Sequence, residues 1–283
     1  MRIKDRNVQC FITGAASGIG RSTAMSMARL GARLFLTDID PAKLKETADL
    51  VTEAGGTVSS QKAVDISQYE QVKNYADQIH AEFGPMDIVM NIAGIAIWGT
   101  VERLGHRHWK KVIDVNLMGP IHVMECFLPP MVGAGKGGHL VNVSSAAGLI
   151  ALPWHAAYSA SKFGLRGISE VLRYDLMRHN IGVSVICPGA VDTPLKQTVE
   201  IVGIDQNHEE VIKMKKRFSN HAISPDAVAS MIVKAVRKNR YLVITSPDIR
   251  LMYGLKKKLF IAYHIVSKRL NGMMYAMMKV AGS

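Results

Sequence analysis

Residues 8–20 read VQCFITGAASGIG, an apolar run that passes directly into a stretch with three closely spaced glycines. The apolar run has the composition of a buried strand, and the residues after Gly20 have the spacing of a helix. Glycine permits both a tight turn and a close approach of the backbone to a bound group. The first N–H groups of a helix favour an anion, so the stretch predicts a pyrophosphate-binding turn. A plain strand-to-helix turn would also contain glycine. The residues expected around the anion are Gly14, Ser17, Gly18, Ile19 and Gly20.

The same alternation of strand and helix continues along the chain. Further β-rich runs cover residues 33–37, 57–64, 87–90, 139–143, 183–187 and 241–245, which makes seven candidate strands. Helical patterns cover residues 20–30, 41–54, 68–83, 106–132, 155–180 and 225–238. This order predicts an α/β fold with one doubly wound parallel sheet, joined by right-handed crossovers. Two stretches, 188–224 and 248–283, fall outside the alternation.

Composition excludes several classes of protein. With 283 residues, 48% hydrophobic and 20% charged, the chain is neither disordered nor collagen-like nor a coiled coil. Cys10, Cys126 and Cys187 lie far apart without a CxxC pair, which argues against a disulfide framework or a structural zinc site. The N-terminus lacks a signal-peptide pattern, and no apolar stretch reaches about 18 residues, so we expect a cytoplasmic protein.

The net charge of +12 is concentrated at the C-terminal end. From Ile249 onward the chain carries seven basic residues and no acidic one. An apolar residue recurs at every third or fourth position from Met252 to Met277, with basic residues on the opposite side. This pattern predicts an amphipathic helix, broken near Gly254 and Gly272. Its apolar side could pack on the body or a partner subunit, or could contact an anionic membrane surface. No nucleic-acid recognition motif is present, so nucleic acid is not an expected partner.

Acidic residues follow two of the predicted strands. In an open parallel sheet the ligand lies beyond the carboxyl ends of the strands, where Asp38 would accept hydrogen bonds from ribose hydroxyls. An acid there also repels a 2′-phosphate, which favours NAD over NADP. The alternative role of Asp38 is a helix N-cap ahead of Pro41. Asp65, after the third strand, could meet the adenine or could serve a turn.

Tyr158 and Lys162 are spaced i, i+4, so both side chains share one face of a helix. A phenol with a pKa near ~10 is a poor base at neutral pH, but an adjacent ammonium favours the phenolate, as does a nearby oxidised nicotinamide. Read alone, this spacing is also that of an ordinary surface pair.

Taken together, these motifs resemble those of the short-chain dehydrogenase/reductase family across residues 7–245. The resemblance rests on residues 13–20, on Asn91-Ile92-Ala93-Gly94, and on the ordered residues that follow them. Those residues are Asn116, Ser145, Tyr158-Ser159-Ala160-Ser161-Lys162 and Pro188-Gly189. Ile92 stands where the family usually has a second asparagine. The resemblance implies a Rossmann-type domain over residues 1–247, with a substrate lid at 188–224 and an extension at 248–283.

The family also implies roles for individual residues. Tyr158 would take the hydroxyl proton in oxidation and return it in reduction, and Ser145 would hold the substrate oxygen. Lys162 would lower the pKa of Tyr158 and bind the nicotinamide ribose, and Asn116 would connect Lys162 to solvent through a proton relay. Thr193 would hold the nicotinamide carboxamide. The remaining residues expected at the cofactor are Asp65, Ile66, Asn91, Ala93, Gly94, Pro188, Gly189 and Val191.

The side chains expected at the substrate are mostly large and apolar: Trp98, Leu149, Trp154, His155 and Leu195. They favour a hydrophobic secondary alcohol or ketone, steroid- or lipid-like, although Trp98 and Trp154 could simply be packed. We expect a homodimer or homotetramer and no metal, with the scattered histidines solvated at predicted surface positions: His80, His106, His108, His139 and His179. The alternatives are a catalytically silent dinucleotide sensor and a membrane- or partner-binding adaptor. The intact Ser145, Tyr158 and Lys162 argue against both.

Overall fold

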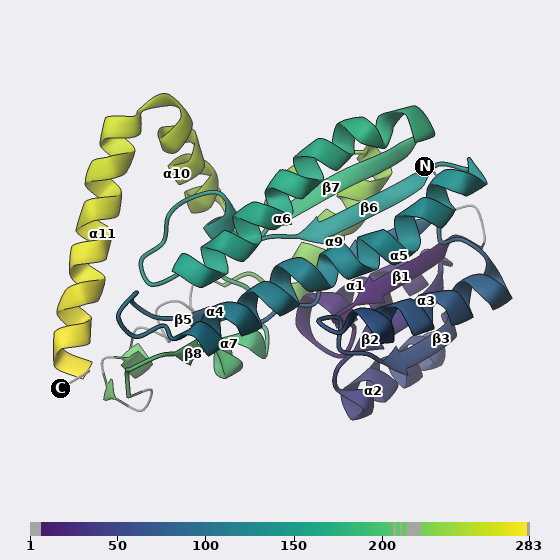
Figure 1. Cartoon of the computed structure of the whole chain (residues 1–283), viewed down its shortest axis with the longest axis horizontal. Helices are drawn as coiled ribbons and strands as arrows, with labels where there is room; N and C mark the ends of the chain where they lie inside the picture. Colours follow the sequence, from purple (N-terminus) through teal and green to yellow (C-terminus); the bar gives the residue numbers. More distant parts are fainter. Residues whose placement is uncertain (1–6, 206–207, 210, 214–221, 282–283) are drawn as a thin grey trace.

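A seven-stranded parallel sheet forms the centre of the protein. The computed structural model describes residues 7–205, 208–209, 211–213 and 222–281. The strands are β1 (Gln9–Thr13), β2 (Arg33–Asp38), β3 (Thr57–Ala63), β4 (Ile88–Asn91), β6 (Gly138–Val143), β7 (Ile181–Cys187) and β9 (Leu242–Ile244). Their order is β3-β2-β1-β4-β6-β7-β9, and every pair is parallel (Figure 1). All seven predicted strands and the α/β class are confirmed.

Helices cover both faces of the sheet because successive strand residues point to opposite sides. On β1, Cys10 and Ile12 belong to the core on one face, whereas Phe11 belongs to the core on the other. The first face is covered by α1 (Gly18–Ala28), α2 (Pro41–Glu53) and α9 (Pro225–Lys238). The second is covered by α3 (Tyr69–Phe83), α5 (Gly119–Ala134) and α6 (Ala156–Asp175). Phe11 stacks on Phe127 of α5 with ring centroids 4.2 Å apart, which fixes that helix over the centre of the sheet.

The helix predicted over 106–132 is interrupted. It consists of α4 (His106–Ile113), a π-helical turn η1 (Asp114–Met118) and α5. Pro120 has no N–H to donate to the carbonyl of Asn116 four residues earlier, and Gly119 N–H instead bonds the carbonyl of Asp114 five residues back. The wider turn therefore centres on Asn116, which was expected in the site.

The predicted lid carries short elements that the sequence analysis did not foresee. β8 (Glu200–Ile201) pairs in parallel with β5 (Ile97–Trp98) in a separate two-stranded sheet, and α7 (Leu195–Thr198) precedes it. Residues 206–207, 210 and 214–221 of the lid lie outside the described residues.

The C-terminal extension forms two helices, α10 (Pro247–Lys258) and α11 (Phe260–Ala281). The expected breaks at Gly254 and Gly272 are wrong: the helix is broken at Leu259, whose backbone leaves the helical region (φ −135°, ψ 64°). Gly254 is tolerated because its neighbours Met252 and Leu255 pack against the body, and that packing outweighs the helix cost of a glycine, about 1 kcal/mol. The side chain of Met277 lies outside the described part of the chain. Within the described residues, no helix combines the length and apolarity needed to cross a membrane.

Two histidines expected at the surface are buried, and the expectation was wrong for both. His108 is held beside the N-terminus of α4, where its Nδ1 accepts from Gly105 N–H at 3.0 Å. His139 is the second residue of β6, and its side chain is buried at the sheet. Its Nε2 lies 2.8 Å from Ser184 Oγ, which itself donates to the carbonyl of Arg240. Burial lowers the pKa of His139 from 6.5 to about 4.

This burial predicts acid sensitivity. Between pH 6.5 and about 4 the unfolded chain takes up a proton at His139 and the folded chain does not, so stability is lost as the pH falls. The pKa difference corresponds to at most about 3 kcal/mol in the free energy of unfolding. Urea unfolding at several pH values should show a shallower acid loss for His139→Gln than for the unaltered protein, with the exposed His106→Gln as matched control. An identical pH dependence in all three proteins would contradict the assignment.

Candidate active site

The turn between β1 and α1 requires its glycines. Gly14 has φ +69°, and a Cβ there would lie 2.7 Å from the backbone N and Cα of Ala93. A Cβ on Gly20 would lie 1.8 Å from the carbonyl oxygen of Gly14. Ser17 precedes α1 in an extended conformation, and its side chain makes no capping hydrogen bond. The Ser17 side chain therefore does not occupy the N-terminus of the helix. An uncapped helix start behind a tight glycine turn fits a phosphate group.

Thr13 ties the end of β1 to the end of β4. Its Oγ1 accepts from the N–H groups of Ile92 and Ala93, at 3.0 and 3.1 Å. Asn91, expected at the cofactor, is 1% exposed and donates from Nδ2 to Asn142 Oδ1 at 2.9 Å. The amide of Asn91 is therefore directed toward the neighbouring strand β6.

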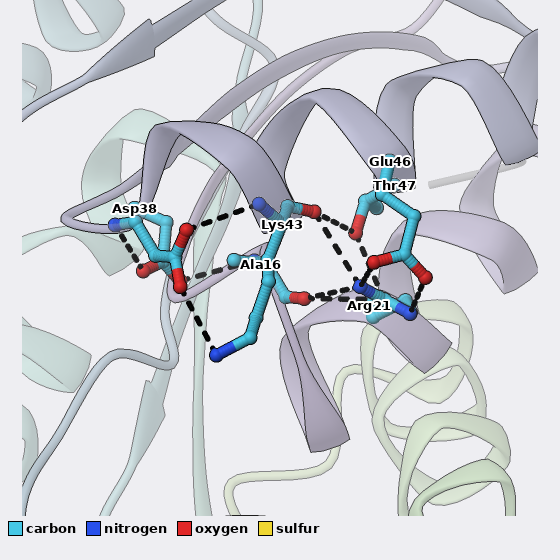
Figure 2. Close-up of polar contacts among 7 residues, drawn as sticks. Ala16, Arg21, Asp38, Lys43, Glu46 and Thr47 are labelled. Atoms are coloured by element: carbon cyan, nitrogen blue, oxygen red, sulfur yellow. Dashed lines mark hydrogen bonds and ion pairs between the residues drawn. The ribbon is translucent and has the colours of Figure 1, made fainter.

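Asp38 ends β2 beside the glycine turn. Its Oδ2 accepts from Ala16 N–H at 3.0 Å and its Oδ1 accepts from Asp40 N–H at 3.1 Å (Figure 2). The N-cap of α2 is Asp40, whose Oδ1 accepts from Lys43 N–H, so the alternative role considered for Asp38 belongs to Asp40. Asp38 is thereby fixed by the backbone and stays at the carboxyl end of its strand.

Two cations close to Asp38 are paired with acids. Arg21 donates to both carboxylate oxygens of Glu46, at 2.7 and 3.0 Å, and also to the carbonyl of Ala16 (Figure 2). Lys43 Nζ lies 3.0 Å from Asp40 Oδ2. The Arg21 guanidinium lowers the pKa of Glu46, and the hydrogen bonds from Lys43 lower the pKa of Asp40. The positive charge beside the glycine turn is thus compensated locally.

Asp65 and Ile66 follow β3. Asp65 Oδ1 accepts from the backbone N–H and the hydroxyl of Ser67, at 2.9 and 2.7 Å, which forms the turn into α3. Ile66 is buried, and its side chain fills the space that a Cβ on Gly119 would need. The turn role left open for Asp65 is therefore present, and its contact with adenine stays a prediction.

Helix α6 is anchored to the carboxyl end of β6 at Lys162. Lys162 is 4% exposed and its Nζ donates to the carbonyl of Val143 at 3.0 Å. Ser144 Oγ donates to the carbonyl of Lys162 at 2.9 Å. Burial lowers the pKa of Lys162 from 10.5 to about 8, so the side chain is still mostly protonated at neutral pH. Lys162 thus brings a buried positive charge to the end of β6.

Tyr158 lies one turn before Lys162, with the side chain of Ser145 beside its hydroxyl. Burial raises the pKa of Tyr158 above its ordinary value, and the neighbouring Ser145 side chain opposes this only in part. Lys162 was expected to lower the pKa of Tyr158, so this shift has the opposite direction. Lys162 Nζ is bonded to the carbonyl of Val143 and lies 5.7 Å from the centre of the Tyr158 ring. The hydroxyl is therefore held in its protonated form.

Asn116 lies in the π-helical turn and is fully buried. Its amide pairs with the backbone of Ile95, accepting from the N–H and donating to the carbonyl, both at 2.9 Å. A Cβ on Gly94 would lie 3.0 Å from Asn116 Oδ1 and 3.4 Å from Lys162 Nζ. Because Gly94 has no side chain, the side chains of Asn116 and Lys162 can both approach its Cα.

The segment after β7 contacts both the turn that follows β6 and the glycine turn that follows β1. The carbonyl of Pro188 accepts from Ala146 N–H at 2.7 Å, and Gly189 packs against Ser246. Val191 is buried in a bridge with Ile223. A Cβ on Gly18 would lie 2.9 Å from the Thr193 side chain, so Thr193 covers the glycine turn.

Aromatic and aliphatic side chains surround Tyr158. Trp98, Trp154 and Leu195 form one cluster with Tyr158, together with Ala96, Val199, Ile201 and Ile204. His155 lies 4.4 Å from Trp98 and 6.0 Å from Tyr158 between ring centres, and burial lowers its pKa to about 4. Leu149, also expected at the substrate, packs instead with the C-terminal helices. Among the described members of this cluster none is charged at neutral pH.

Comparison with known proteins agrees with this geometry. The profile described as short chain dehydrogenase matches residues 9–201. The chain belongs to the short-chain dehydrogenase/reductase family. A curated relative, "Probable oxidoreductase EphD" of Mycobacterium tuberculosis, is 35% identical over 252 residues, which are 88% of this chain and 42% of EphD. The chain thus spans less than half the length of that relative.

Solved structures of short-chain dehydrogenases share the fold along most of their length. One from Burkholderia phymatum in complex with NAD has a TM-score of 0.80 at 28% identity, covering 90% of this chain and 94% of that chain. A metagenomic short-chain oxidoreductase in complex with NADP has a TM-score of 0.67 at 30% identity, covering 84% and 95%. Family members similar to this chain therefore bind either nicotinamide cofactor.

Several residues of this short-chain dehydrogenase site were missed by sequence reasoning. Thr13, Asn142 and Ser144 are polar residues inside buried strands or at their ends, and that position was the signal that could have identified them. Arg21 follows the glycine turn directly, but its partner Glu46 lies on another helix. No sequence pattern indicated that pairing.

Proposed function

We propose that the protein is an NAD-dependent oxidoreductase that interconverts a hydrophobic secondary alcohol and its ketone. The observation that carries the proposal is the position of the Tyr158 hydroxyl, beside Ser145 in an apolar cluster, with the buried Lys162 one helical turn away. A proton donor, a second hydroxyl and a cation at the end of one strand suit proton transfer to a carbonyl oxygen.

The cofactor site would use both halves of the sheet edge. The uncapped start of α1, with Ser17, Gly18 and Ile19, would receive the pyrophosphate, and Asp38 would accept from the adenosine ribose. Thr193, beside Gly18, would hold the carboxamide. When bound, the nicotinamide supplies the hydride acceptor or donor.

The chain's own residues would move the proton. Tyr158 donates its proton to the carbonyl oxygen in reduction, and the raised pKa of its buried hydroxyl favours this protonated form. Ser145 would orient the same substrate oxygen. Lys162 would stabilise the phenolate that remains, and Asn116, adjacent to Lys162 across Gly94, would position it for proton return from solvent.

The side chains around Tyr158 support the proposed substrate class. Trp98, Trp154 and Leu195 offer apolar contact, and His155 is neutral at pH 7 because its pKa lies near 4. A carboxylate or phosphate next to these side chains would lose its hydration, and none of the described members of the cluster would supply it with a cation. We therefore assign a steroid- or lipid-like ketone or alcohol.

The proposal is tested by the absorbance of reduced nicotinamide in a paired substrate screen. Each apolar ketone, such as a steroid, is compared with a carboxylated analogue of the same size, with NAD(H) and NADP(H) in parallel. We expect turnover of the apolar member and little of its carboxylated partner. Preference for the carboxylated member would contradict the substrate class.

Replacing Tyr158 by phenylalanine should remove nearly all turnover, by a factor of at least about a hundred, because only the transferable proton is lost. Cofactor binding, measured by calorimetry, should stay within a few-fold of the unaltered protein. As a matched control, Tyr174→Phe changes an exposed tyrosine on the same helix. Substantial activity in Tyr158→Phe would remove this residue as the proton donor.

Cofactor preference should depend on the charges near the glycine turn. Asp38→Asn keeps an acceptor for the backbone but removes the carboxylate, so kcat/KM with NAD should fall by about tenfold to a hundredfold and the gap to NADP should narrow. Adding Glu46→Gln releases Arg21 and should improve NADP further. Asp49→Asn on the same helix is the control. Strong NADP preference in the unaltered protein would show that Asp38 does not select the cofactor.

A further inference from the structure

Helix α11 stands along one side of the molecule, apart from the layers that cover the sheet (Figure 1). It is held there by Tyr263, whose hydroxyl accepts from Ala151 N–H at 2.8 Å and whose ring lies in a buried cluster with Leu149 and Ile150. Lys256 of α10 donates to the carbonyl of Leu149 at 2.7 Å. The helix pair is thus fixed to the segment that leads from Ser145 to Trp154.

The outer face of α11 is apolar and basic at once. Phe260, Ile261 and Ile265 are 67%, 78% and 49% exposed. Ile261, Ile265 and Lys268 follow the i, i+4, i+7 spacing of one helix face, roughly opposite Tyr263. Lys257, Lys258, Lys268 and Arg269 are exposed as well. Basic residues were expected opposite the apolar stripe, and the exposed Ile261 and Ile265 lie on that side as well.

We propose that this outer face, defined by Ile261, Ile265, Lys268 and Arg269, docks the protein on the surface of an anionic lipid bilayer, with the exposed Phe260 at its edge. Exposed apolar side chains reach the acyl boundary, while lysine and arginine extend to the headgroups. The extension carries seven basic residues and no acidic one from Ile249 onward, so its partner must be negatively charged.

The charge also argues against the same face of a second copy as the occupant. Pairing two α11 helices through this face would bring basic residues of one against basic residues of the other, without an acid in either α11 helix. A bilayer containing acidic phospholipid satisfies both the apolar and the cationic residues. Because α10 and α11 are anchored on Leu149, Ile150 and Ala151, docking would bring the segment between Ser145 and Trp154 near the lipid.

The test is co-sedimentation of the full-length protein with vesicles of phosphatidylcholine alone or with added phosphatidylglycerol, at low and high salt. We expect binding to the anionic vesicles only. High salt should weaken this binding, because at 0.1 M salt charges are already screened over roughly 10 Å. Two double variants, Ile261→Asp with Ile265→Asp and Lys268→Glu with Arg269→Glu, should each lose at least about tenfold in binding. Both should keep the melting temperature and activity of the unaltered protein, because these side chains are exposed.

Matched controls carry the same changes elsewhere. Val171→Asp with Met177→Asp alters exposed apolar residues in and after α6, and Lys234→Glu with Arg237→Glu alters exposed basic residues on α9. Both controls should bind like the unaltered protein. Absence of binding to anionic vesicles, equal binding by the α11 variants, or dissociation of an oligomer by Ile261→Asp with Ile265→Asp without lipid would each overturn the proposal.

Discussion

The docking of α6 on the carboxyl end of β6 at Lys162 is the contact on which the site depends. Lys162 receives a hydrogen bond at its carbonyl from Ser144 and gives one from Nζ to Val143. Gly148 permits this approach, since a Cβ there would lie 2.8 Å from the Lys162 carbonyl. Tyr158 is one turn earlier on the same helix, so the docking that buries Lys162 also places the phenol beside Ser145. Tyr158 and Lys162 are thus held by the packing of one helix on one strand.

The nucleotide-binding half is built at the same sheet edge, where the strand order reverses between β1 and β4. Thr13 joins these two strands at their carboxyl ends, and Gly14 is pressed against Ala93. Much of the glycine pattern is required by this packing alone. What the packing leaves is an uncapped helix start, a fixed carboxylate at Asp38 and a covering Thr193. These features lie where a dinucleotide would connect the turn to Tyr158.

Sequence reasoning identified the strands and the family because each depends on local composition or on ordered motifs. It failed where the contacts of a side chain depend on a partner that is distant in the sequence. Asn91 turns into the sheet toward Asn142, and Arg21 is neutralised by Glu46 on another helix. His139 was assigned to the surface although β6 carries it into the core. The helix break falls at Leu259 and not at a glycine, because packing of α10 on the body outweighs local propensity. The π-helical turn at Asn116 could have been anticipated from Pro120.

The central claim is that packing of α6 partly buries Tyr158, so that its hydroxyl stays protonated at neutral pH in the cofactor-free protein. The most direct measurement is the ultraviolet absorbance of tyrosinate during a pH titration of the cofactor-free protein. The chain has eight tyrosines, so the signal of Tyr158 is the difference between the unaltered protein and Tyr158→Phe. The account predicts that this difference titrates above 10.0, the ordinary pKa of tyrosine, because burial raises the pKa of Tyr158. A difference that titrates at or below that pKa would contradict it.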